Sequence, residues 1–174
     1  DDDTAEYALG WRLYERGNLL MNQVEIKPIA HKYLVKLNQL LNETVHLVTR
    51  VDREALYIDK INGNNTLVIY SRIGKKVPLH CSAVGKVLTA YLEQDQFEKI
   101  FKHYEFKQST ANTILTYEAF LSEMEIVREQ GYAVDNEENE AGIYCMAMPV
   151  YDYTQKVVAA ISVSSPLVNF TEEK

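Results

Sequence analysis

The sequence predicts an α+β domain built on one antiparallel sheet of about six strands. Segments with apolar residues at alternating positions gather in two blocks, near residues 45–73 and 132–165, and short polar turns separate the segments within each block. Segments with the apolar spacing of a helix precede the first block and fill the interval between the two. With 174 residues, 47% of them hydrophobic, the chain can bury the core of one such domain.

The chain opens with two predicted helices. Residues 8–21 crowd apolar side chains into a helical segment, although Gly10 and Gly17 each weaken a helix by up to about 1 kcal/mol. Residues 29–44, which follow Pro28, place apolar side chains at regular helical spacing. We therefore expect helices at both places before the first strand.

The remaining elements follow in order. The first block predicts strands over 45–48, 55–61 and 66–73, and residues 74–81 then read as a loop containing Pro78. Helical patterns follow at residues 82–92, 95–104 and 117–130, and Gly131 ends the last of them. The second block predicts strands over 132–135, 142–152 and 157–165, with the loop 137–141 before the second of these and the turn 153–156 before the third. Thr171 is a candidate cap for one more helix.

The amino-acid composition disfavours several classes of function. Lys and Arg number 18 against 25 Asp and Glu, so the net charge of −7 disfavours direct binding to phosphate backbones. Cys81 and Cys145 form no CxxC pattern, which makes zinc-ribbon and thioredoxin interpretations unattractive. No apolar run reaches the roughly 18 residues that span a bilayer. We expect a cytoplasmic protein with no membrane association and no cofactor.

The stretch "GKKVPLHCSAVGKVLTAYL", residues 74–92, raises the question of catalysis. Cys81 or Ser82 would need a base held by a third group, and His80 does not serve Cys81 if the two are strand neighbours on opposite faces. A hydrolase remains the least favoured alternative. A metal site drawing on His80, Cys81, Asp135 and Cys145 is a second alternative, although short-spaced ligand pairs are absent from the sequence.

Ser82 suggests a different role for this stretch. As a helix N-cap it would leave the amides of Ala83 and Val84 at the helix start, where unpaired N–H groups and the helix dipole favour an anion. Gly85 in the first turn would let a ligand approach the backbone closely. The alternative is an ordinary cap with Gly85 packed against a strand.

Other polar residues stand at positions where a site could form. Asp135 ends a short strand, and the glutamates that follow it read as a solvated loop. Ser162 and Ser164 lie two residues apart on an apolar strand, so both hydroxyls face one side and need partners in backbone, water or a ligand. If Asp135 serves a ligand, Asp135→Ala should leave the unliganded fold largely intact.

These motifs resemble a known family. "PLHCSAVGKVLTA", "REQGYAVDNEENEAGIYCMAMPVYD" and "VVAAISVSSP", in this order, are similar to the effector-binding domain of IclR-family bacterial transcription regulators, with the resemblance running from about Tyr7 to the last residue. "YIDKI", "YSRIGKKVPLHCSAVGKVL" and "NEENEAG" look most like family members that sense 2-keto-3-deoxygluconate.

The resemblance implies a GAF-like (profilin-like) fold and a division of the chain. Residues 1–22 would be a tail and the linker helix from a winged helix-turn-helix domain that is not in this sequence, and residues 23–174 would be the effector-binding domain without its closing C-terminal helix. Family members also imply a homodimer or homotetramer that reaches operator DNA only through that N-terminal domain.

The resemblance also implies a ligand site and a function. The family pocket corresponds here to residues at the helix start and on the later strands: Ser82, Ala83, Val84, Asp135, Ile143, Cys145, Ser162 and Ser164. We expect a non-catalytic sensor, a repressor domain relieved by a 2-keto sugar acid. Arg72 and Lys86 are candidates for extra charge partners of the ligand, although such residues are more often exposed on these elements. The small "SAVG" and Tyr144 depart from much of the family. A GAF-like oligomerisation domain with a vestigial or metal-binding pocket remains the main alternative.

Overall fold

The computed structural model describes residues 10–23, 25–64 and 71–170. The helices in these segments are α1 (Trp11–Gln23), α2 (Ile26–Leu41), α3 (Ala83–Ala90), α4 (Gln94–Phe101) and α5 (Tyr117–Gln130), with a 3-10 turn, η1, at Leu167–Asn169. The strands are β1 (Thr44–Val51), β2 (Glu54–Ile61), β3 (Lys76–Pro78), β4 (Ala133–Asn136), β5 (Ile143–Tyr151) and β6 (Val157–Pro166).

The strands form one sheet in the order β3-β2-β1-β6-β5-β4, and every neighbouring pair is antiparallel. The predicted fold class is confirmed: an α+β domain with six strands among the described residues. The last strand of the chain, β6, lies between β1 and β5 at the centre of the sheet.

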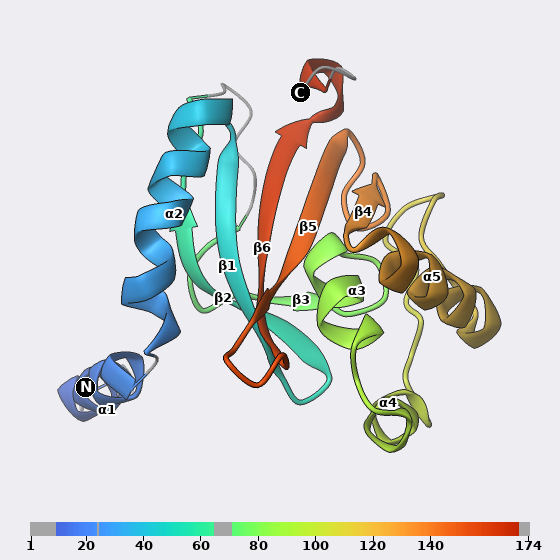
Figure 1. Ribbon diagram of the computed structural model, residues 1–174, viewed down its shortest axis with the longest axis horizontal. Coiled ribbons are helices and arrows are strands. Elements are labelled where there is room, and N and C mark those ends of the chain that lie inside the picture. The colour runs from blue at the N-terminus through green and yellow to red at the C-terminus, as the bar shows by residue number, and fades with distance from the viewer. Residues whose placement is uncertain (1–9, 24, 65–70, 171–174) are drawn as a thin grey trace, which may run out of the picture.

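Helices cover both faces of the sheet, as Figure 1 shows, with α2 on one side and α3 and α5 on the other. Alternation along β1 separates the two cores, because Val45 and Leu47 face α2 while Val48 joins the cluster that contains α3. All eight residues of α3 are buried. This helix therefore fixes the shape of the face on which polar residues gather.

Most element boundaries agree with the sequence pattern. Thr116 caps α5 by accepting a hydrogen bond from the Ala119 amide, and Gly131 ends it in a left-handed conformation with φ 81°. The helix predicted from residue 29 begins earlier, at Ile26, because a proline in the first turn lacks only a donor that has no partner there. The helix predicted to reach residue 104 ends at Phe101.

The sequence interpretation differs from the structure around the third strand. Residues 66–70 of the strand predicted over 66–73 lie outside the described residues, and residues 71–73 are not in a strand. Instead, three residues of the predicted loop, Lys76–Pro78, form the edge strand β3 against β2. A strand this short has too few residues to show a period of two, and Pro78 fits at a sheet edge. In the described segments, no helix is long and apolar enough to cross a membrane.

Candidate functional site

A cavity of about 130 Å³ opens between the start of α3 and the polar face of the sheet. All the residues predicted for the site line it: Ser82, Ala83, Val84, Asp135, Ile143, Cys145, Ser162 and Ser164. They come from α3 and its cap and from three strands, so the fold gathers segments that lie far apart in the sequence. The lining also includes residues that the sequence did not suggest, among them Tyr57, Ser71, Lys75, Asn139 and Glu140.

The start of α3 has the predicted cap. Ser82 is in an extended conformation, and its Oγ accepts a hydrogen bond from the Gly85 amide (3.1 Å) while donating one to the Pro78 carbonyl (2.6 Å). In the described part of the chain, no acceptor is bonded to the amides of Ala83 and Val84. Both residues line the cavity, where two N–H groups and the positive end of the helix dipole favour an anion.

Gly85 serves the packing of the chain itself. A Cβ atom added there would lie 2.5 Å from the Cα of Leu79, closer than any side chain tolerates. The close approach that this glycine permits is therefore that of the Leu79 backbone, immediately after β3. The expectation that Gly85 packs against the chain itself is therefore supported, while Ala83 and Val84 still line the cavity.

Three polar side chains form a row across neighbouring strands. Asp135 on β4 faces Cys145 on β5, and Cys145 faces Ser164 on β6. The Cys145 Sγ donates to the Ser164 Oγ at 3.0 Å, so Ser164 has a protein partner. Burial raises the pKa of Cys145, which keeps it a neutral thiol. The row gives the cavity hydrogen-bonding groups and one carboxyl group.

Asp135 has a structural role as well as a place in the cavity. Its Oδ1 accepts hydrogen bonds from the backbone amides of Glu138 (2.7 Å) and Asn139 (3.2 Å), which fold the next loop back over the strand. Burial raises its pKa to about 7, more than those two hydrogen bonds lower it, and the charge of Glu138 adds to the rise. The carboxyl group therefore titrates near neutral pH.

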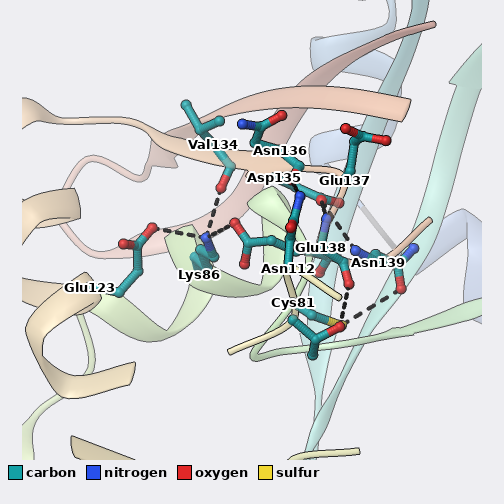
Figure 2. Close-up of polar contacts among 12 residues, drawn as sticks. Cys81, Lys86, Asn112, Glu123, Val134, Asp135, Asn136, Glu137, Glu138 and Asn139 are labelled. Carbon is teal, nitrogen blue, oxygen red and sulfur yellow. Dashed lines mark hydrogen bonds and ion pairs between the residues drawn. The ribbon is translucent and has the colours of Figure 1, made fainter. Parts of the chain in front are cut away.

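Lys86 lies beneath the cavity and is buried, contrary to the expectation of an exposed charge. Figure 2 shows its Nζ between the Glu123 carboxylate, the Val134 carbonyl and the Glu138 carboxylate, at 2.8, 2.8 and 2.5 Å. Glu138 is 8% exposed, so the expectation of a solvated glutamate loop is wrong at this residue. The second oxygen of Glu138 has no hydrogen-bond partner among the described residues. The ion pairs anchor α5 and the loop to α3.

The geometry gives no support to the two chemical alternatives, a hydrolase that uses Cys81 or Ser82 and a metal site. His80 Nε2 lies 3.1 Å from the Lys107 carbonyl and Nδ1 lies 3.1 Å from the Tyr104 hydroxyl, so both ring nitrogens are engaged away from Ser82 and Cys81. Burial raises the pKa of Cys81 to about 12. In the segments that the structure describes, no three His, Cys, Asp or Glu side chains are grouped closely enough to hold a metal ion.

His46 is the residue of this region that sequence reasoning missed. It lies on β1 opposite Ser162, with its Nδ1 3.2 Å from the Ser162 Oγ. Its signal in the sequence is weak: it alternates with Val45 and Leu47, which places it on the face away from α2. A lone histidine between apolar residues gives no indication of the strand that will lie beside it.

Comparison with known proteins shows which family the chain belongs to. Residues 19–174 match the model of the bacterial transcriptional regulator IclR C-terminal domain. The chain is 37% identical to the HTH-type transcriptional regulator XynR and 38% identical to the HTH-type transcriptional regulator KdgR, both of Escherichia coli K12, over 98% and 100% of its length. It spans 71% of XynR and 66% of KdgR.

A solved structure agrees with these relatives. The crystal structure of the Thermotoga maritima IclR superposes with a TM-score of 0.87 and 39% sequence identity, over 96% of this chain and 68% of that one. The sequence resemblance is thus confirmed by a family model, by curated relatives and by a structure. The chain belongs to the IclR family of bacterial transcriptional regulators, and residues 19–174 correspond to the family's C-terminal, effector-binding domain.

Proposed function

We propose that this domain senses a 2-keto sugar acid, with 2-keto-3-deoxygluconate as the first candidate, and that the bound acid controls a DNA-binding domain in the whole protein. One observation carries the proposal: the Ala83 and Val84 amides open on the same cavity as Asp135, Ser162 and Ser164. The amides suit a carboxylate, and the side chains opposite suit hydroxyl groups, which donate and accept hydrogen bonds, and a keto group, which accepts them.

The size and lining of the cavity favour a small, hydroxylated acid. A cavity of about 130 Å³ is smaller than the roughly 300–1,000 Å³ typical of drug-sized ligands. Ile143 supplies an apolar wall, while Lys75 and Lys76 line the cavity on the β3 side; the charge of Lys76 is paired with Glu54 at 2.7 Å. The sequence likeness to regulators that sense 2-keto-3-deoxygluconate points to the same class of compound.

In this proposal, operator DNA is bound by a separate domain of the whole protein. We propose that residues 1–22 belong to the linker from a winged helix-turn-helix domain and that residues 23–174 are the sensing unit. The acidic charge of this chain fits such a division, because binding to operator DNA would be left to the other domain. The whole protein would be a repressor that the acid releases.

Self-association follows from the same proposal, since a symmetric operator requires a symmetric protein. Trp11 and Leu13 on α1 are 82% and 55% exposed and are available for contacts with a second copy or with the DNA-binding domain. We expect sedimentation of the 174-residue chain to show a dimer or tetramer at high concentration. A monomer throughout would count against this part of the proposal.

Calorimetry tests the ligand assignment. We expect heat on titration of 2-keto-3-deoxygluconate into the chain, and about 2.7 kcal/mol of added stability when the acid is present at roughly one hundred times its dissociation constant. Ser162→Ala with Ser164→Ala should weaken binding by on the order of 10-fold or more, whereas Ser122→Ala on the exposed face of α5 should not. No heat with any of several 2-keto acids would leave the oligomerisation alternative as the better reading.

A further inference from the structure

Behind the Ser162 wall of the cavity, one imidazole contacts two serines. His46 Nδ1 lies 3.2 Å from the Ser162 Oγ, and His46 Nε2 lies 2.7 Å from the Ser71 Oγ. Both serines line the cavity, whereas His46 is 1% exposed and is not among the lining residues. Ser71 and Ser162, which come from distant segments of the chain, thus present their hydroxyls to the cavity with the His46 ring between them.

The surroundings of His46 keep its ring neutral. Tyr57 lies beside it with ring centroids 4.8 Å apart, and Lys60 is its partner on β2, with its Nζ donating to the Ser71 carbonyl at 2.7 Å. Burial, with a smaller effect from the Lys60 charge, lowers the pKa of His46 to about 3. A second positive charge in this position is unfavourable, so the imidazole carries one proton at neutral pH.

A neutral imidazole treats its two partners differently. It has one N–H group and one nitrogen with a lone pair. The serine that receives the N–H keeps its own O–H free to donate elsewhere. The serine at the other nitrogen donates its O–H to the ring. Toward the cavity it then has only lone pairs and acts as a hydrogen-bond acceptor. This holds for either tautomer, so the conclusion does not depend on which nitrogen carries the proton.

We propose that His46 gives Ser162 and Ser71 opposite hydrogen-bonding roles toward the cavity, one donor and one acceptor, and thereby selects ligands that present an acceptor to one serine and a donor to the other. A hydroxylated carbon chain has this character, and a plain keto acid or an aromatic acid does not. The inference rests on the proposed function, since it concerns the ligand of the same cavity. His46 acts as a positioning residue, because it meets the ligand only through the serines.

Nitrogen NMR of the unliganded 174-residue chain tests the roles of the serines without any ligand. We expect the His46 ring to show one protonated and one unprotonated nitrogen, with no change from about pH 5 to about pH 8. Two protonated nitrogens at neutral pH, or signals averaged between two tautomers, would overturn the proposal, because the serines would then share the same role or exchange roles.

Ligand selectivity tests the second half of the inference. His46→Phe keeps a ring beside Tyr57 but removes both nitrogens. We expect it to weaken 2-keto-3-deoxygluconate binding roughly 10-fold while leaving pyruvate, which has no hydroxyl groups, within about 2-fold. The ratio of the two affinities is the readout, because partial unfolding of the variant would weaken both ligands equally.

Two further variants separate positioning from packing. His46→Gln, whose amide has both a donor and an acceptor, should restore most of the selectivity. In a Ser71→Ala, Ser162→Ala background, His46→Phe should have little further effect. An equal loss for both acids, or a full effect in that background, would refute the role of His46. If the wild-type chain binds neither acid, the proposed function fails and the selectivity falls with it, while the NMR result still decides the roles of the serines.

Discussion

Lys86 and Glu138 form an ion pair 2.5 Å long beneath the cavity, with side chains only 2% and 11% exposed. Removing one partner of such a pair leaves the other charge buried without compensation. The pair joins α3, whose first turn lines the cavity, to the loop that Asp135 folds. Its integrity therefore bears on both the stability of the domain and the shape of the site.

Lys86→Met should lower the free energy of unfolding by about 3 kcal/mol or more, because Glu138, Glu123 and the Val134 carbonyl all lose their donor. Lys36→Met on the exposed side of α2 is the matched control and should change it by no more than about 0.5 kcal/mol. Urea denaturation at neutral pH measures both variants. Similar values for the two would mean that the buried pair contributes no net stability.

Asp135→Ala should destabilise the unliganded chain, because two backbone amides lose their acceptor. This differs from the expectation that, if Asp135 serves a ligand, its replacement by Ala leaves the unliganded fold largely intact. Asp135→Asn keeps an acceptor oxygen for the two amides and should melt well above Asp135→Ala at neutral pH. Thermal unfolding followed by circular dichroism compares them, and an Ala variant as stable as the Asn variant would contradict the structural role.

The raised pKa of Asp135, about 7 in the folded chain against an ordinary value of 3.8, predicts how stability depends on pH. The folded chain holds this proton while the unfolded chain has released it, so the stabilisation present below about pH 4 is lost as pH rises toward 7. Relative to Asp135→Asn, the wild type should lose up to about 1.4 kcal/mol per pH unit across this interval. Urea denaturation at several pH values gives the slope, and parallel curves for the two proteins would refute it.

Binding of an acid in the cavity should be accompanied by proton uptake. A ligand carboxylate at the Ala83 and Val84 amides would share the cavity with the Asp135 carboxyl group, and two like charges at close range raise the pKa further. Affinity should therefore increase as pH falls from about 8 to about 6. Calorimetry in buffers with different ionisation enthalpies detects the proton. In Asp135→Asn the uptake should disappear, and its persistence there would place the proton elsewhere.

Gly85→Ala should destabilise the domain by about 1–3 kcal/mol, because the new Cβ would meet the Leu79 backbone at 2.5 Å. Gly17→Ala is the control: in α1 a Cβ at that position meets nothing within 4 Å, so the change should be neutral or stabilising by up to about 1 kcal/mol. The denaturation midpoints of the two variants measure this difference. If Gly85→Ala were neutral, the approach of Leu79 to α3 would be looser than the structure has it.

Cys81 should resist alkylation in the native chain at mildly alkaline pH, because burial raises its pKa to about 12 and only the thiolate reacts. Iodoacetamide labelling followed by mass spectrometry should show rapid reaction only after unfolding in urea. Fast labelling of the folded chain at Cys81 would revive the interpretation of this residue as a nucleophile.

The sequence was sufficient for the site residues that follow a local rule. Ser82 and the two amides after it are predicted from the rules of helix capping. Ser162 and Ser164 are predicted from the alternation of side chains along a strand. The burial of Lys86 follows no local rule, because its partners Glu123 and Glu138 lie 37 and 52 residues away. A lysine in a helix pattern looks the same whether water or two carboxylates surround it.

The central place of β6 determines when the cavity can exist during synthesis. Ser162 meets His46 across 116 residues of chain, and β6 follows both β1 and β5 in the sequence although it pairs with both. Until residues 157–166 are available, β1 and β5 have exposed edges where β6 should lie, and pairing across such distances is slow. A nascent chain halted before β6 would lack Ser162 and Ser164 of the cavity wall and would have two unpaired strand edges.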